Sequence, residues 1–181
     1  ADRAEQLWID GLLGVLLNQP ERTRTALATL RADTSGVLRQ VARSLEAVRL
    51  DRAGIAGAAD SAMAVSDDTM RDGGFLMSVE SVNRLIVARA LVRRGQPERA
   101  ERYLRWTDAG SNTPRTSSTQ HGVGFFTAYE RGVALDEAGR ADAAAYQLRK
   151  FVSNYTSPPE AHRGLVEDAK ARLARIEAAK R

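Results

Sequence analysis

The amino-acid sequence predicts an all-α fold, and three features of its pattern support this prediction. Apolar residues recur every three to four positions, the period of an amphipathic helix, along almost the whole chain. Glycine and proline stand where helices are expected to end and begin, as Gly95 and Pro97 do. No segment sustains the alternation of apolar and polar residues that a half-buried strand requires, so we expect no β-sheet.

The N-terminal half is expected to form two pairs of helices. The first pair covers about residues 3–33, and Pro20 suits the first position of its second helix, where a missing N–H is no loss. The second pair covers about residues 36–66, and Gly54 separates its two helices. A loop rich in Asp and Gly follows at 66–74.

The C-terminal half is expected to form two more pairs and a terminal helix. The third pair covers about residues 75–108. Residues 107–124 hold Gly, Ser, Thr, Asn and Pro with almost no apolar residue, and this composition predicts a connecting loop. The fourth pair covers about 124–155, and an amphipathic capping helix is expected at about 159–179.

Composition limits the class of protein. Of the 181 residues, 43% are apolar and 28% are charged, which fits one domain or one stack of repeats with a sizeable core. The apolar run Leu12–Leu17 is broken by Gly14 and is far shorter than the roughly 18 residues of a membrane span, so we expect no membrane insertion. Because there is no cysteine, disulfides, thiolate catalysis and cysteine-ligated zinc are excluded.

Arginine carries almost all of the positive charge. The 27 Lys and Arg residues are interspersed with 23 Asp and Glu residues, for a net charge of +4. This distribution attracts polyanions only weakly, and with aromatic residues at 6% we expect no nucleic-acid binding. A high Arg-to-Lys ratio is typical of a GC-rich bacterial genome. We expect an excised part of a longer bacterial protein, in the cytoplasm rather than the periplasm.

Two segments carry the same spaced residues. In residues 88–100 and 132–144, a small residue is followed by an apolar residue, then by a glycine and then by an alanine, at the same offsets. Leu104 and Leu148 follow these alanines at equal distance. A weaker copy carries the same offsets at Ala47, Leu50, Gly54, Ala59 and Met63. This pattern resembles the tetratricopeptide repeat, in which small residues allow close helix packing and the glycine forms the turn.

The resemblance implies an architecture for the whole chain. We expect a right-handed α-solenoid of about four tetratricopeptide-like helix pairs plus the C-terminal capping helix, as one domain over residues 1–181. The first pair fits in two registers, with Gly11 or Gly14 at the small position. The turn glycines stand further apart than the family period of about 34 residues, so the geometry of the superhelix can differ from that of the family.

The resemblance also implies a function, namely binding of a protein or peptide segment in a concave face built from the first helix of each pair. Carrying the register over to this chain gives the candidate partner-binding residues Ser44, Val48, Arg52, Arg89, Arg93, Phe126, Tyr129 and Asp136. The basic clamp of family members that bind C-terminal carboxylates is not visible, so such ligands are disfavoured. Substitution of Tyr129 by Ala or Arg89 by Glu is expected to weaken partner binding.

Two alternatives to this interaction module remain. One is a small-ligand-sensing helical segment of a bacterial signalling protein or transcriptional regulator, with a pocket lined by Tyr103, Trp106 and Phe125. The other is a structural spacer without a ligand.

Catalytic, metal and cofactor sites are not expected. The two histidines, His121 and His162, are predicted to be exposed to solvent, and the loop 107–124 lacks a phosphate-binding motif. The arginines between positions 99 and 105 are expected to form a solvated face paired with Glu98 and Glu101. We therefore predict that the protein is not an enzyme.

Overall fold

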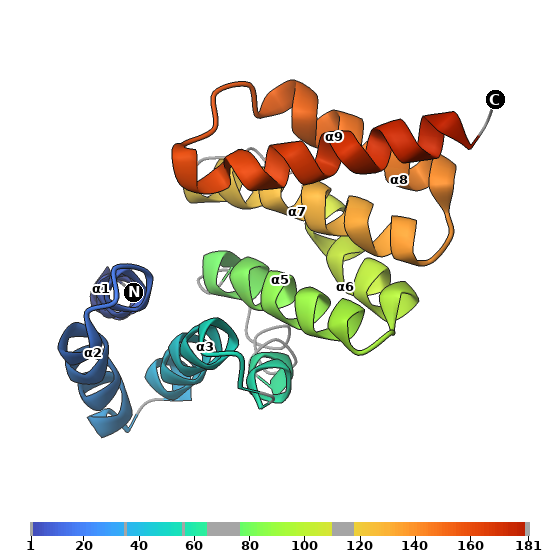
Figure 1. Cartoon of the computed structure of the whole chain (residues 1–181). Helices are drawn as coiled ribbons and strands as arrows, with labels where there is room; N and C mark the ends of the chain where they lie inside the picture. The colour runs from blue at the N-terminus through green and yellow to red at the C-terminus, as the bar shows by residue number, and fades with distance from the viewer. Residues whose placement is uncertain (1, 35, 56, 65–76, 110–117, 180–181) are drawn as a thin grey trace. The chain divides into compact units, whose positions relative to one another are not determined.

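The computed structural model describes residues 2–34, 36–55, 57–64, 77–109 and 118–179 (Figure 1). Every regular element in these residues is a helix, and they contain no strand. The predicted all-α fold is confirmed. The described chain divides into two compact units, Ala1–Ala90 and Leu91–Arg181, and each has its own hydrophobic core.

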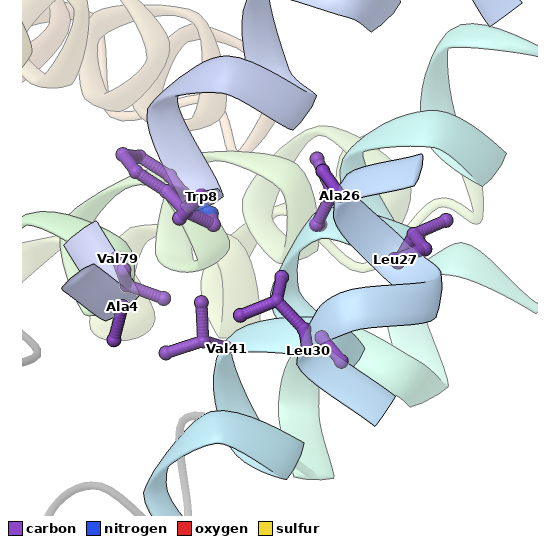
Figure 2. Packing of buried hydrophobic residues seen from close by; sticks show 9 residues of the cluster. Ala4, Trp8, Ala26, Leu27, Leu30, Val41 and Val79 are labelled. Carbon is purple, nitrogen blue, oxygen red and sulfur yellow. The ribbon is translucent and has the colours of Figure 1, made fainter. Parts of the chain in front are cut away.

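Unit 1 contains the first helices of the chain. They are α1 (Asp2–Leu16), α2 (Pro20–Ala32), α3 (Gly36–Arg52), a short helix at residues 58–64, and most of α5 (Met77–Arg93). Helices α1, α2 and α3 pack against one another in all three combinations. Figure 2 shows their shared core, in which Trp8 of α1, Leu30 of α2 and Val41 of α3 meet Val79 of α5.

Unit 2 contains the remaining helices. They are α6 (Pro97–Ala109), α7 (Ser118–Glu137), α8 (Ala141–Asn154), the 3-10 turn η2 (Glu160–His162) and α9 (Arg163–Ala178). Helix α7 packs against α6, α8 and α9, and α8 also packs against α9 (Figure 1). A Cβ added at Gly132 of α7 would lie 2.7 Å from Leu148 Cδ2, so glycine is what lets α8 approach α7 this closely.

Four turns between consecutive helices share one geometry. Gly54, Gly95 and Gly139 have φ values of 70°, 69° and 71°, and Asn18 takes the same left-handed conformation with φ 54°. In each turn this residue and the next donate their N–H groups to carbonyls three and five positions earlier, as Gly95 does to Val92. These bonds form the Schellman motif that satisfies the last carbonyls of a helix.

The role of Asn18 settles the register of the first helix pair. Gly11 stands at the same distance before Asn18 as Ala88 before Gly95, and it is buried as Ala88 is. A Cβ at Gly11 would collide with the side chain of Leu45. Gly11 therefore stands in this pair where Ala88 stands before Gly95. A Cβ at Gly14 would also lie 2.8 Å from the backbone N of Thr23, so both glycines let α2 approach α1 closely.

Some helix boundaries differ from the sequence-based expectation. The expected loop 107–124 is helical at both ends, because α6 continues to Ala109 and α7 begins at Ser118. Gly, Ser and Thr lower helix propensity by about 1 kcal/mol or less each, so polar composition alone does not end a helix that packing supports elsewhere. The fourth helix begins at residue 58 rather than at Ile55, whose N–H completes the preceding turn by bonding to Leu50. Residues 65–76, which include the predicted loop 66–74, lie outside the described residues.

Candidate functional site

The predicted residues of α3 differ in how far a partner could reach them. The side chain of Ser44 is fully buried, and its Oγ donates a hydrogen bond to Asn83 Oδ1 of α5 at 3.0 Å. Val48, one turn further along α3, is half-buried. Arg52 at the end of the helix is exposed, and its Nη2 donates to the carbonyl of Leu16 at 3.4 Å. Ser44 therefore serves the packing of α3 on α5, whereas Val48 and Arg52 are open to solvent.

The two predicted arginines of α5 fall in different units. Arg89 is half-buried and belongs to unit 1, and Arg93 is exposed and belongs to unit 2. Ser44, Val48 and Arg52 stand at successive helical turns of α3.

The predicted residues of α7 lie beneath the C-terminal helix. The hydroxyl of Tyr129 donates a hydrogen bond to Asp168 of α9 at 2.8 Å, and the Tyr129 ring packs on Phe151 of α8. The buried carboxylate of Asp136 accepts a hydrogen bond from Arg172 Nη1 at 2.6 Å and another from Arg175. Helix α9 is therefore attached to α7 by polar contacts near both of these predicted residues.

Phe126, the third predicted residue of α7, belongs to an aromatic cluster. Its ring centroid lies 5.2 Å from that of His162 and 6.1 Å from that of Tyr155, and both pairs are edge-to-face. Such pairs contribute about 0.5–1.5 kcal/mol beyond the burial of their area. His162 is half-buried among these rings, so the expectation of a solvent-exposed histidine was wrong there. The side chain of His121 lies outside the described residues.

The charge states of the α7–α9 contact are stable near neutral pH. Burial and the hydrogen bond to the Asp168 carboxylate both raise the pKa of the Tyr129 hydroxyl, which therefore keeps its proton. Burial alone would lower the pKa of Arg172, but its hydrogen bonds to three carboxylates outweigh this effect and raise that pKa. Those carboxylates belong to Glu137, Asp136 and Asp168. A partner that contacts the Tyr129 hydroxyl or the Asp136 carboxylate would compete with α9 for them. A binding role for Phe126, Tyr129 and Asp136 stays a prediction.

A basic cleft on unit 1 was not anticipated. A hollow of about 850 Å³ is lined by α2, α3 and the end of α1. A second hollow of about 410 Å³ adjoins it beside α3 and the helix 58–64, and Arg31 and Glu46 line both. We name this surface the α3 cleft. Its charged lining consists of six arginines and one carboxylate: Arg24, Arg31, Arg39, Arg43, Arg49, Arg52 and Glu46.

A sequence signal for the α3 cleft existed. Arg24 and Arg31 stand two helical turns apart on α2, and Arg39 and Arg43 stand about one turn apart on α3. The sequence gives no sign that these two arginine-bearing faces border the same hollow, because that depends on how α2 packs on α3.

Apolar side chains are exposed along one side of α1. Ile9, Leu13, Leu16 and Leu17 are between 37% and 57% exposed. Their spacing places them within an arc of roughly 100° on the helix surface. We name them the α1 stripe. None of the four lines the α3 cleft.

In unit 2, one buried carboxylate accepts hydrogen bonds from arginines of two helices. Glu101 of α6 is 3% exposed and accepts hydrogen bonds from Arg105 of the same helix at 2.5 Å and from Arg131 of α7 at 3.0 Å. Burial would raise the pKa of Glu101, but these hydrogen bonds outweigh it and lower the pKa. The expected pairing of Arg105 with Glu101 is present, and it is part of a contact that joins α6 to α7.

The described residues contain no group of three metal-ligating side chains. Of the three aromatic residues predicted to line a small-ligand pocket, Tyr103 is half-buried, whereas the side chains of Trp106 and Phe125 lie outside the part of the chain that is described. Within the described part, no helix combines the length and apolar character that crossing a membrane requires. Comparison of the chain with protein-family models, with curated proteins and with solved structures found no match.

Proposed function

We propose that the chain is a tetratricopeptide-like, right-handed α-solenoid that binds a segment of another protein, as part of a larger bacterial protein. The repeated turn supports this architecture. Asn18, Gly54, Gly95 and Gly139 share one backbone conformation and one hydrogen-bond pattern. A buried small residue stands at the same distance before each of these turns. Stacking of such helix pairs is how repeat proteins bury apolar faces that a single pair leaves exposed.

The α1 stripe is the observation that carries the proposed function. Single exposed apolar residues are ordinary on a protein surface, but several adjacent ones are typical of an interaction site. The four side chains of the stripe recur along one side of a helix, which suits an apolar helix or strand of a partner. The proposal assigns the chain no catalytic step and no cofactor.

Affinity capture from a lysate of the source organism tests this function. The bait is the native chain, compared with the double variant Leu13→Ser, Leu17→Ser and with the control Tyr146→Ser. Tyr146 is 65% exposed on α8, more than Leu13 or Leu17, so the control removes a large exposed side chain far along the sequence. A protein retained by the native chain and by the control, but lost by the double variant, supports the proposal. Equal recovery by all three baits argues against the α1 stripe.

The α3 cleft favours a second candidate, a sensor of a small ligand. Its larger hollow, at about 850 Å³, falls within the range of about 300–1,000 Å³ for small-molecule pockets. A thermal-shift screen of metabolites tests this candidate. Stabilisation by a small anion that is lost in Arg49→Gln would support the sensor, and no stabilisation by any metabolite would count against it.

A further inference from the structure

The lining of the α3 cleft holds more basic than acidic side chains. Six arginines and the carboxylate of Glu46 line it, and one of these arginines, Arg24, pairs with Glu21 of its own helix. Arg49 Nη2 forms an ion pair with Glu46 Oε1 at 2.6 Å, and Arg31 Nη2 lies 3.8 Å from Glu46 Oε2. The hydrogen bond from Arg49 lowers the pKa of Glu46, so this carboxylate is ionised at neutral pH and already engaged.

The arginines at the two ends of the cleft contact no carboxylate of the described residues. At one end, Arg52 bonds only to the carbonyl of Leu16, at 3.4 Å, and a carbonyl does not neutralise a guanidinium. At the other end, Arg39 is exposed and makes no hydrogen bond or ion pair with another described residue. Each guanidinium therefore has its donors available for an external carboxylate or phosphate.

The distance between these two ends determines the size of the occupant. Arg39 and Arg52 stand on the same helix, α3, about 20 Å apart along its axis at 1.5 Å per residue. A single small anion cannot reach both ends. An extended peptide of about six residues or a helix of about 13 residues spans that length.

Apolar side chains lie between the arginines. Val15 and Leu27 line the larger hollow, and Ala42 lines the smaller one. A segment that carries acidic residues and also apolar residues therefore fits this surface better than a uniformly charged polyanion.

From these observations we infer that the α3 cleft binds an acidic, partly apolar segment of a partner protein, with carboxylates that pair with Arg39 and Arg52. This inference extends the proposed function to a second surface with a defined partner chemistry. It rests on the proposed function only in assigning polypeptide binding to the chain, because no residue of the α1 stripe lines the cleft.

Fluorescence anisotropy with defined peptides tests the inference. The probe is a labelled peptide of about 13 residues made of Glu and Leu, compared with a matched peptide that has Gln in place of Glu and one that has Ser in place of Leu. We expect the Glu–Leu peptide to bind the native chain more tightly than either matched peptide. Its affinity should fall as salt is raised, because screening weakens exposed ion pairs.

Charge reversal at the two ends of the cleft locates the site. The double variant Arg39→Glu, Arg52→Glu should bind the Glu–Leu peptide roughly tenfold more weakly or worse. The matched control is Arg163→Glu, Lys170→Glu, which makes the same change in net charge at two exposed positions of α9 and should leave binding unchanged. If circular dichroism shows that the reversal variant does not fold, Arg39→Gln and Arg52→Gln replace it.

Three outcomes would overturn the inference. The cleft and control variants could lose affinity for the Glu–Leu peptide equally, or the native chain could fail to bind that peptide. The native chain could also bind polyphosphate or duplex DNA more tightly than the peptide. The variant Leu13→Ser, Leu17→Ser should keep its affinity for the peptide, and loss of binding there would assign the peptide to the α1 stripe instead. Failure of peptide binding leaves the lysate capture unaffected, so the two proposals fail separately.

Discussion

Buried carboxylates organise the polar contacts of unit 2. Glu101 joins α6 to α7 through Arg131, and Asp136 joins α7 to α9 through Arg172. In both contacts a nearly buried acidic side chain meets arginines that retain some exposure. Removal of the carboxylate would leave partly buried arginines without an opposite charge. This should lower the free energy of unfolding more than removal of an exposed ion pair does.

The first prediction concerns Glu101. Glu101→Gln is expected to lower the free energy of unfolding at neutral pH by roughly 1–3 kcal/mol, because Arg105 and Arg131 lose their charged partner. The pKa of Glu101 is lower in the folded chain than in the unfolded chain. Its carboxylate therefore stabilises the fold fully above the unfolded value of about 4.3, and this contribution is lost as pH falls through the lower folded pKa.

Urea unfolding at a series of pH values checks this prediction. Stability of the native chain should fall more steeply on acidification than that of Glu101→Gln. Glu177→Gln is the control, because Glu177 pairs with Arg149 at the surface and should contribute about 0–1 kcal/mol. Identical acid dependence in the native chain and in Glu101→Gln would refute the assigned role.

The second prediction separates the two parts of the Tyr129 side chain. Tyr129→Phe removes only the hydrogen bond to Asp168 and should cost about 0.5–1.5 kcal/mol. Tyr129→Ala also removes the ring from the core beside Phe151 and should cost about 3–5 kcal/mol. Chemical denaturation measures both values. Equal costs would mean that the ring contributes nothing to the core. Because of the larger expected cost, Tyr129→Ala is a poor test of partner binding.

At the scale of elements, the turns between paired helices depend on residues that tolerate a left-handed backbone. Three of them are glycines and one is Asn18, which is among the few other residue types that adopt this conformation readily. An added Cβ at Gly95 would meet nothing within 4 Å. The requirement for glycine there comes from the backbone angle alone and not from crowding.

The third prediction follows from that distinction. Gly95→Ala should destabilise the fold by about 1–2 kcal/mol, the cost of a left-handed conformation for a residue with a Cβ. Gly164→Ala on α9 should instead stabilise it by about 0.5–1 kcal/mol, because Gly164 lies inside a helix with open space around it. Thermal unfolding compares the two variants. A stabilising Gly95→Ala would contradict the turn geometry.

Most elements could be predicted because local signals set them. Helical periodicity predicted the paired helices, and Pro20 and Pro97 stand at the first positions of α2 and α6 as expected. The polar composition of residues 107–124 predicts a loop, but α7 begins at Ser118, because a helix can include polar residues and glycine. The register of the first pair follows from the left-handed backbone conformation of Asn18, and the sequence alone does not reveal that conformation.

At the scale of the whole molecule, the functional surfaces were harder to predict than the helices. Tyr129 and Asp136 of α7 contact α9, and the sequence does not reveal which face of α7 the terminal helix covers. How the helices pack also decides that the α1 stripe is exposed. It likewise decides that arginines of α2 and α3 line the same α3 cleft. A periodic sequence indicates that a face exists and not what it contacts.

The fourth prediction tests whether stability is local, as it is in a stack of repeats. Removal of residues 159–181 deletes the partners of Tyr129 and Asp136 and takes Ala169 and Ile176 out of the core, which uncovers Leu148 and Phe151 of α8. In a repeat array each unit depends mainly on its neighbours. Hydrogen exchange should therefore accelerate in α7 and α8 and remain unchanged in α1, α2 and α3. Equal acceleration in all of these helices would contradict a stack of locally stabilised pairs.

Site-specific photocrosslinking tests most directly whether this chain binds a protein through the α1 stripe. A photoreactive phenylalanine analogue replaces Leu17 in one variant and Tyr146, which is equally accessible, in the other, and each variant is irradiated in a lysate of the source organism. The interaction module predicts a discrete covalent adduct with another protein from position 17 and none from position 146. Adducts of the same proteins from both positions, or none from position 17, would contradict it.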